Sequence, residues 1–202
     1  NEMLKSSKLI ITNQLLKLFN CILSQSIYPS AWNKSILTPL HKSGELSDTN
    51  NFRGVAVSSC LGKLFNKILN TRLEQKCVRE GLINDCQGSS KKGSRTADHL
   101  LVIKFLIDKY VSGANKKLFV CFFDIRRAFD TIPRNLLFYT ILKNYKIGGN
   151  YLKILQKIYS SNEIFVKLSG GLCEPFVSSV GVLQGQTNSP LLFNLFVNKI
   201  TE

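Results

Sequence analysis

The chain has 202 residues, enough for one ordinary domain or two small lobes with a buried core. Apolar residues make up 44% and charged residues 20%, which excludes a disordered chain, a collagen and a disulfide-rich miniprotein. Lysine and arginine number 27 against 13 acidic residues, a formal net charge of +14. Such an excess indicates a nucleic-acid partner, although a solvated basic surface would give the same count.

The cysteines and the hydropathy indicate the cellular compartment in which the protein is expected. The six cysteines, at positions 21, 60, 77, 86, 121 and 173, form no C-x-x-C pair, and only two histidines accompany them. This spacing does not favour a zinc site, and the apolar neighbours predict small buried thiols in a reducing compartment. No apolar run is long enough to span a membrane, and the opening residues lack a signal-peptide pattern. We therefore expect an intracellular protein, either nuclear or cytoplasmic.

Hydrophobic periodicity in the first half predicts helices around a β-hairpin. Apolar residues recur at helical spacing near the start and again in two later stretches. Two short apolar runs flank a polar loop, which favours a hairpin with Pro39 on an edge strand and Lys42 and Arg53 beside the tip. In chain order, the expected helix, two strands and two helices span residues 7–26, 35–40, 52–57, 61–81 and 96–111.

The second half begins with a linker and a strongly apolar strand. Residues 112–117 (SGANKK) are the best boundary between two lobes. Residues 117–124 (KLFVCFFD) are almost wholly apolar and rich in aromatic and β-branched side chains, the pattern of a strand buried on both faces. Two helices, a hairpin and a last helix are then expected, at residues 133–145, 149–160, 162–169 with 174–182, and from 189 onward. Helices that alternate with short strands indicate an α+β or α/β fold.

Asp124 is the first candidate catalytic residue. It follows a run of hydrophobic residues, so it should emerge at the end of a buried strand and face a crevice. A carboxylate held there by a rigid element is suited to binding a metal ion. The competing interpretation is that Asp124 only caps the following turn, as Asp130 is expected to do for the helix after Pro133.

Two other groups of residues suit a phosphate or a nucleotide. In GVLQGQTNSP, Gln184 can both donate and accept hydrogen bonds, and Gly185 allows a close backbone approach. Ser189 and the proline after it begin a helix whose N-terminus suits a phosphate, although the stretch would also serve as a plain strand–turn–helix joint. Lys42 and Arg53, on one hairpin, would clamp a polyphosphate or else be two exposed surface cations.

Five motifs occur in an order that is more specific than any one of them. They are W-x-x-S-x-L-x-P-L-x-K, N-F-R-G, Q-G-x-x-K-K-G-S-R-T-A-D, F-x-D-I-x-x-A-F-D and G-V-x-Q-G-x-x-x-S-P-L-L-F-N-L-F. From about Pro29 to Asn198, this series resembles the reverse transcriptase domain of non-LTR (LINE-type) retrotransposons. The resemblance implies an α+β right-hand polymerase fold. It divides the chain into an N-terminal helical segment (1–34), fingers (35–115) and a partial palm (116–202).

The resemblance implies a role for each matching residue. Asp124 would bind Mg²⁺ in a two-metal site, with the backbone carbonyl of Ile125 as a second ligand, for transfer of a nucleotide from a dNTP to a primer 3′-hydroxyl. Phe129 would be the sugar gate that favours dNTP over rNTP. The other nucleotide contacts would come from Lys42, Arg53, Arg127, Ala128, Gln184 and Gly185.

The resemblance also implies nucleic-acid partners. An RNA template and a DNA primer, paired as a hybrid, would lie in the cleft between the lobes and be bound through phosphates, with strong salt dependence. Lys91, Lys92 and Arg95 are the candidates for template contacts, and an exposed basic loop is the competing interpretation. A C-terminal palm half and a thumb would complete the enzyme, and an upstream endonuclease domain is left open.

Departures from the family pattern bear on activity. Gly54 replaces the proline of the usual N-Y-R-P-I, the loop from Gln87 to Lys92 is one residue short, and both changes suit a drifting copy. The aromatic–Ala–Asp–Asp motif does not occur within the 202 residues. One aspartate cannot hold two catalytic metals, so we expect the chain alone not to polymerise. The alternative is a non-catalytic RNA-binding relic or domesticated module. Apolar surface left uncovered beside residues 117–124 predicts poor solubility.

Overall fold

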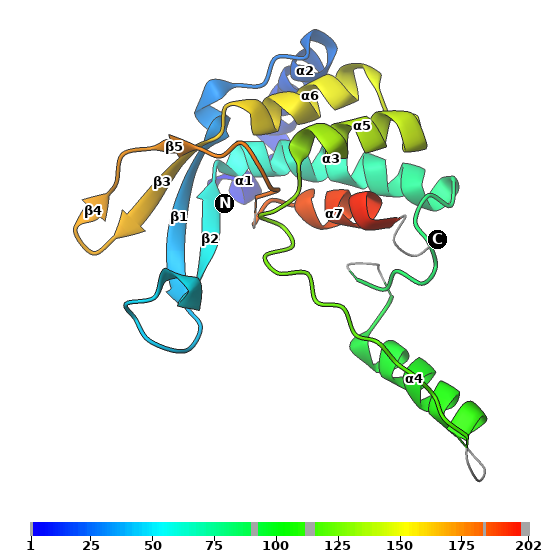
Figure 1. The fold of residues 1–202 in the computed structure, drawn as a ribbon. Helices are drawn as coiled ribbons and strands as arrows, with labels where there is room; N and C mark the ends of the chain where they lie inside the picture. Colours follow the sequence, from blue (N-terminus) through cyan, green and yellow to red (C-terminus); the bar gives the residue numbers. More distant parts are fainter. Residues whose placement is uncertain (1, 90–92, 112–115, 184, 199–202) are drawn as a thin grey trace.

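The computed structural model describes residues 2–89, 93–111, 116–183 and 185–198, and its architecture is α+β (Figure 1). The elements in chain order are α1 (Glu2–Ser6), α2 (Lys8–Gln25), a 3-10 turn (Ser30–Asn33), β1 (Lys34–His41), a second 3-10 turn (Thr49–Asn51), β2 (Phe52–Ser58), α3 (Cys60–Arg79), α4 (Thr96–Val111), α5 (Arg134–Tyr145), α6 (Gly149–Ser160), β3 (Glu163–Leu168), β4 (Gly171–Leu172), β5 (Phe176–Val177) and α7 (Ser189–Val197). The predicted helices agree with α2 to α7 within about two residues, because apolar spacing and flanking breakers mark each of them.

The predicted β1–β2 hairpin is confirmed. The strands pair antiparallel from Ser35 opposite Ser58 to His41 opposite Phe52. The full sheet order is β2-β1-β3-β4, with β5 also on β3, so β1 is an inner strand over part of its length. Pro39 nevertheless lies beyond the residues that β3 covers, which end at Leu37, so the missing N–H of the proline interrupts no ladder there.

The parallel pairing of β1 with β3 joins segments about 130 residues apart. Lys34 stands opposite Glu163, and their side chains form an ion pair of 3.5 Å. Buried polar groups at the start of β1 fix this pairing more firmly, because Asn33 donates to the backbone oxygen of Lys157 at 3.1 Å. The hydroxyl of Ser35 donates to the side-chain oxygen of Asn162 at 3.2 Å. Buried hydrogen bonds of this kind hold one register, since shifting the strand would leave them unpaired.

The helices share one hydrophobic core beside the sheet. In Figure 1, α2, α3, α5, α6 and α7 gather on one side of the strands, and buried side chains from all five belong to a single cluster. Phe65 of α3, Leu155 of α6 and Leu192 of α7 are almost fully buried. Each large apolar side chain buried in this way contributes about 1.5–3 kcal/mol, so this core is the main source of stability for the body.

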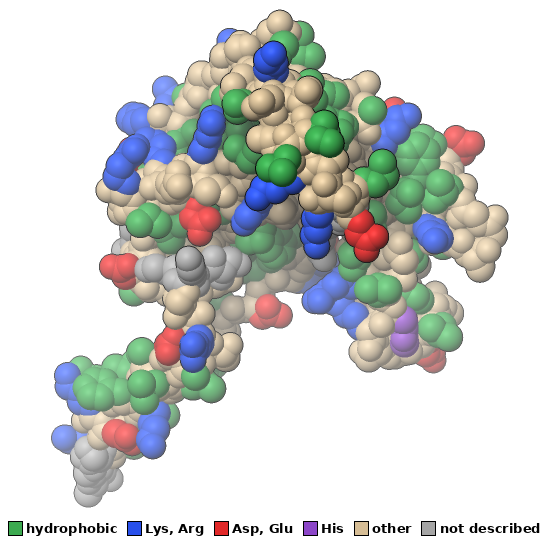
Figure 2. Space-filling view, turned by 180° about the vertical axis from the view of Figure 1, so that it is seen from behind, with side chains coloured by type: hydrophobic (Ala, Val, Ile, Leu, Met, Phe, Trp, Pro, Cys, Tyr) green, Lys and Arg blue, Asp and Glu red, His purple; other side chains and the backbone are tan. Residues whose placement is uncertain are grey.

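The expected strand at residues 117–124 is wrong. Residues 116–125 form no strand, and Phe119, Phe122 and Phe123 are 90%, 80% and 90% exposed. Helix α4 has no buried residue, and it projects with the following segment away from the body, where hydrophobic side chains cover much of the arm (Figures 1 and 2). A strand forms only when its backbone groups find partners, and no described segment pairs with this one.

Two smaller expectations also differ from the structure. Strand β3 forms as predicted, but the return strand is split into the two-residue pieces β4 and β5, because Pro175 just before β5 cannot donate to a ladder. The cysteines are mostly not buried: Cys77 is buried, whereas the other five are exposed and all six are free thiols.

Within the described ranges, no helix is long and apolar enough to cross a bilayer. The predicted lobe boundary falls largely on residues 112–115, outside the described ones.

Candidate functional site

A cavity of about 730 Å³ lies between the β1–β2 hairpin, the segment 124–130 and the start of α7. Eight of the predicted site residues line it, namely Lys42, Arg53, Asp124, Ile125, Arg127, Ala128, Phe129 and Gly185. The rest of the described wall is formed by Asn50, Phe52, Gly54, Arg126, Asp130, Gln186, Ser189 and Pro190. Segments that lie far apart in the sequence therefore meet around one opening.

The cavity wall is positively charged. Among the described lining residues, four are cationic and two are acidic: Lys42, Arg53, Arg126 and Arg127 against Asp124 and Asp130. Cations from two separate elements face the same space, which favours an anion with several charges over a neutral ligand. The two carboxylates lie on the side formed by residues 124–130, so the wall also offers oxygen ligands to a cation.

The hairpin positions two of these cations. Lys42 follows β1 directly, and its backbone N–H donates to the oxygen of Asn51 at 2.8 Å. Arg53 lies in β2, opposite Leu40. The guanidinium of Arg127 donates to the side-chain oxygen of Asn50, which links the hairpin loop to the acidic segment. The predicted pair of hairpin cations thus lines the cavity, although both residues are also exposed to solvent.

Residues 126–130, directly after Asp124 and Ile125, form a turn that is anchored at its end. Arg127 has a φ of 51°, in the left-handed region, and the N–H of Asp130 donates to the oxygen of Arg127 at 2.8 Å. The ring of Phe129 stacks on Phe193 of α7, with centroids 5.1 Å apart and an interplanar angle of 27°. This stacking helps to hold Phe129 in the wall, because such an aromatic pair contributes about 0.5–1.5 kcal/mol beyond its buried area.

Short backbone contacts join this turn to the glycine-rich stretch. The N–H of Val182 donates to the oxygen of Phe129 at 2.7 Å, and the N–H of Gly181 donates to the oxygen of Ile132 at 2.8 Å. A Cβ added to Gly181 would lie 2.7 Å from the backbone oxygen of Asp130. Glycine is therefore required for the two segments to approach this closely.

Gly185 makes a similar approach to the sheet. Its φ is 100°, and an added Cβ would lie 2.7 Å from the backbone oxygen of Ala56 in β2. The sequence predicted a close backbone approach at this glycine, and the structure shows that the neighbour is the protein's own strand. Gly185 therefore closes the cavity by bringing the start of α7 against β2.

Gln186 is a functional position that the sequence analysis missed. It is 8% exposed, and its amide nitrogen donates to the hydroxyl of Ser58 at 3.2 Å. Its side-chain oxygen accepts from Asn66, a fully buried residue of α3, at 3.1 Å. The glutamine therefore links the segment before α7 to both β2 and α3 by hydrogen bonds. The sequence gives no sign that Gln186, rather than Gln184 two residues earlier, is buried. A polar residue at a turn is usually exposed.

Arg134 is a second missed residue, and it supports the cavity from behind. Its guanidinium is buried and donates to the backbone oxygens of Gly181 at 2.8 Å, Val180 at 3.0 Å and Tyr159 at 2.8 Å, and also to that of Ser178. Burial lowers the pKa of this arginine, and the carbonyl acceptors offset the loss of water. One signal in the sequence pointed to it, since a cation at the start of a helix opposes the helix dipole and needs another reason to be there.

Several predicted contacts lie elsewhere. Arg95 is exposed, its backbone N–H donates to the carboxylate of Asp98 at 2.7 Å, and it does not line the cavity. Lys91, Lys92 and Gln184 lie outside the described residues. The prediction that Lys91, Lys92 and Arg95 contact a template therefore stays a prediction.

The metal expectation can be compared with the donor set of the wall. Mg²⁺ prefers oxygen ligands, and the Asp124 carboxylate and the Ile125 carbonyl belong to residues of the same wall. No group of three or more His, Cys, Asp or Glu side chains in the described parts of the chain could hold a metal ion. The described residues thus fit one side of a magnesium site and do not complete it.

Comparison with known proteins agrees with this geometry. Residues 40–202 match the family described as reverse transcriptase (RNA-dependent DNA polymerase). The chain is 23% identical to a probable RNA-directed DNA polymerase from transposon BS of Drosophila melanogaster, over 97% of this chain and 21% of that protein. It is 26% identical to a retrovirus-related Pol polyprotein from the type-1 retrotransposable element R2 of Popillia japonica, over 85% of this chain and 24% of that protein.

A third relative belongs to the same group. It is the RNA-directed DNA polymerase from mobile element jockey of Drosophila melanogaster, 26% identical over 90% of this chain and 20% of that protein. The chain spans at most about a quarter of the length of these three relatives, which are polymerases of non-LTR retrotransposons. Together with the matching family, which covers most of the chain, these relatives show that the chain belongs to the reverse transcriptases, the RNA-directed DNA polymerases.

Proposed function

We propose that this chain is the fingers and the first part of the palm of a non-LTR retrotransposon reverse transcriptase, and that its 730 Å³ cavity binds the incoming dNTP. The observation that carries the proposal is the meeting of Lys42 and Arg53 with Asp124, Phe129 and Gly185 around one opening. The motif series names these residues separately, and the fold brings them to one wall.

The triphosphate would lie against the cationic part of the wall. Lys42 and Arg53 would bind the β- and γ-phosphates from the hairpin, because ammonium and guanidinium groups form the strong, charge-assisted hydrogen bonds that phosphates accept. The backbone amides near Arg127 and Ala128 would contact the same phosphates from the turn. Gln184 and Gly185 would lie beside the base of the nucleotide.

Asp124 would supply the acidic part of the site. Its carboxylate and the Ile125 carbonyl would hold one side of a Mg²⁺ ion, and acids beyond the described residues would be needed for a two-metal site. When bound, such ions activate the primer 3′-hydroxyl and neutralise charge on the leaving pyrophosphate. With a single matching aspartate, the chain alone is expected not to polymerise.

Phe129 would select the sugar. Its ring stacks on Phe193, and this contact favours the orientation in which Phe129 lines the cavity. A 2′-hydroxyl pressed against such a ring would lose its hydrogen bonds to water without gaining others. The gate would therefore favour dNTP over rNTP.

An RNA template and a DNA primer would be the nucleic-acid partners, bound through the positive charge of the chain. A second candidate function is a non-catalytic RNA-binding module of reverse transcriptase ancestry. The net charge of +14 favours nucleic-acid binding in either case. The two candidates differ in whether the complete reading frame can extend a primer.

Primer extension on an RNA template with Mg²⁺ and dNTPs tests the proposal. Three proteins are compared: this chain, the chain extended by roughly 100 residues of its reading frame, about one small domain, and the extended form with Asp124→Asn. We expect the extended form to copy RNA and the other two to be inactive, while Asp124→Asn still binds an RNA–DNA hybrid as tightly as its parent.

Two results would contradict the proposal in different ways. Template-directed incorporation by this chain alone would show that the described residues already form a sufficient site. An extended form that binds the hybrid but never incorporates a nucleotide would favour the non-catalytic module. Lys17→Asn in the extended form is a matched control, because Lys17 is an exposed residue of α2 that does not line the cavity, and its loss should leave incorporation within about two-fold of the parent.

A further inference from the structure

A second, smaller cavity lies where α3 passes the turn between α5 and α6. Its volume is about 290 Å³, and it shares no lining residue with the nucleotide cavity. Arg72 and Lys76 of α3 and Lys146 of the turn line it, together with Tyr151 of α6. Within the described chain, no Asp or Glu lines it, so its wall carries only positive charge.

The three cations come from two elements that hold them in place. Arg72 and Lys76 are four residues apart on α3, so they lie on the same face of the helix, one turn from each other. Lys146 ends α5 in the left-handed region, with a φ of 54° and its backbone N–H bonded to the oxygen of Ile141. The next residue, Ile147, donates to the same oxygen at 3.2 Å. The turn that carries Lys146 is therefore fixed by hydrogen bonds.

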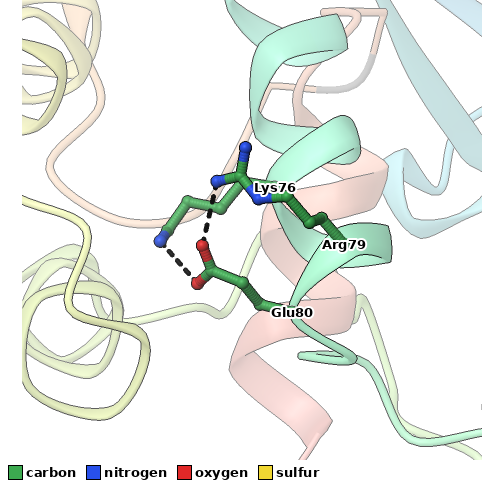
Figure 3. A network of polar contacts seen from close by, with 3 residues as sticks. All are labelled: Lys76, Arg79 and Glu80. Atoms are coloured by element: carbon green, nitrogen blue, oxygen red, sulfur yellow. Dashed lines mark hydrogen bonds and ion pairs between the residues drawn. The ribbon is translucent and has the colours of Figure 1, made fainter.

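The nearby carboxylate of Glu80 already forms ion pairs with cations of its own helix region. Glu80 pairs with Lys76 at 2.6 Å and with Arg79 at 3.0 Å, and Figure 3 shows both cations reaching this one carboxylate. These two partners also lower the pKa of Glu80, so it stays charged at neutral pH. Glu74 of the same helix lines a different cavity. Arg72 and Lys146 form no ion pair with any described residue, so their charges remain available.

We propose that this cavity is a phosphate-binding site, distinct from the nucleotide cavity, that takes a phosphodiester of a bound nucleic-acid strand. Guanidinium and ammonium groups that face one small cavity from two sides match the charge and the several oxygen acceptors of a phosphate. Helix α6 begins at this place without an acidic residue in its first turn and without a side-chain cap, so its dipole adds to the positive potential. The site stands on its own residues and does not require the dNTP proposal.

Amide NMR spectra of the 202-residue chain, titrated with inorganic phosphate and separately with a ten-nucleotide single-stranded RNA, test the site. The site variant is Arg72→Ala with Lys76→Ala and Lys146→Ala. The matched control is Lys17→Ala with Lys104→Ala and Lys109→Ala, which removes three exposed cations that line neither cavity. Because a triple change in α3 could disturb folding, Lys146→Glu at an exposed position is measured alongside.

We expect phosphate to shift the amide signals of Ile147 and Gly148 in the parent and the control, and not in the site variant or Lys146→Glu. For the RNA, the site variant should bind at least ten-fold more weakly. Its slope of log K against log salt should be shallower by about 0.7, the contribution of one phosphate contact of a single strand. Phosphate shifts with unchanged RNA binding would instead identify a free phosphate as the ligand and overturn the assignment to a nucleic-acid strand.

The proposal is overturned if phosphate leaves Ile147 and Gly148 unshifted in the parent, or shifts them equally in Lys146→Glu. A dATP titration of the same samples reports the nucleotide cavity through the amides of Asp124 and Gly185. If dATP does not shift the amides of Asp124 and Gly185 while phosphate still shifts that of Gly148, only the dNTP proposal fails. Failure of the dNTP proposal and failure of the phosphate site are therefore distinguishable.

Discussion

Arg127 and Phe129 lie on one short turn just after Asp124, and the wall of the 730 Å³ cavity depends on how that turn is held. Arg127 bonds to Asn50 in the hairpin loop, and Phe129 stacks on Phe193 of α7. Arg134, just after the turn, donates to the backbone oxygen of Gly181 at the start of the glycine-rich stretch and to that of Tyr159 in α6. The residues that would touch the substrate are thus positioned by residues that would not.

Gly185→Ala should destabilise the protein. The methyl group would lie 2.7 Å from the oxygen of Ala56, and alanine at a φ of 100° is strained whatever the space. We expect a loss of about 1–3 kcal/mol in the free energy of unfolding, measured by urea denaturation. Gly170→Ala is the control, because no atom lies within 4 Å of its added Cβ, and it should change stability little. Equal stability of the two variants would contradict the close approach.

At the scale of elements, α4 and residues 116–125 differ from the other long helices of the described chain. The other long helices bury an apolar face in the common core, whereas α4 buries no residue. The three exposed phenylalanines after it are the type of side chain that a sheet normally covers. This arm is therefore the surface most prone to self-association.

Replacing Phe119, Phe122 and Phe123 together by serine should reduce self-association of this chain. Because these rings are 80–90% exposed, their removal should leave the free energy of unfolding nearly unchanged. Light scattering with size-exclusion chromatography measures the first effect, and urea denaturation measures the second. Leu155→Ser is the contrasting variant, since Leu155 is fully buried and its loss should cost about 3 kcal/mol or more. A large stability loss from the phenylalanine variant would mean that the segment is packed as a strand.

At the scale of the whole molecule, burial makes the protein sensitive to alkali. Burial raises the pKa of Tyr28 and of Tyr159 from 10.0 to about 12, and that of Cys77 from 9.0 to about 11. The folded state therefore keeps these protons at pH values at which the unfolded chain releases them. The stabilisation is fully present below about pH 9 and is lost as the pH rises through the window from 9 to 12.

The free energy of unfolding should accordingly stay level from pH 7 to about 9 and then fall. Each group that ionises only in the unfolded state contributes a slope of about 1.4 kcal/mol per pH unit. Urea denaturation at successive pH values measures the curve. Burial also raises the pKa of Tyr151, so four groups contribute. Tyr159→Phe removes one of them and should make the fall shallower above pH 10. A curve that stays flat up to pH 11 would show that these side chains are not buried in solution.

Much of this protein follows from its sequence. The bounds of α2 to α7 follow from apolar spacing and from breakers such as Pro133 and Gly81, which act within one or two turns of chain. The motif series identified the family, and it named eight residues of the cavity wall before the fold was known. These are local patterns, so one-dimensional information is sufficient to find them.

The tertiary structure decided the rest, because those features depend on partners that are distant in the sequence. Pairing of β1 with β3 rests on Asn33 and Ser35 meeting residues of the α6–β3 turn. Gln186 and Arg134 are polar residues of a kind usually found at the surface. They can be buried because the side chains of Asn66 and Ser58 pair with Gln186 and backbone carbonyls accept from Arg134. The KLFVCFFD stretch has the composition of a buried strand and remains extended and exposed, because apolar character does not make a strand without neighbours to pair with it.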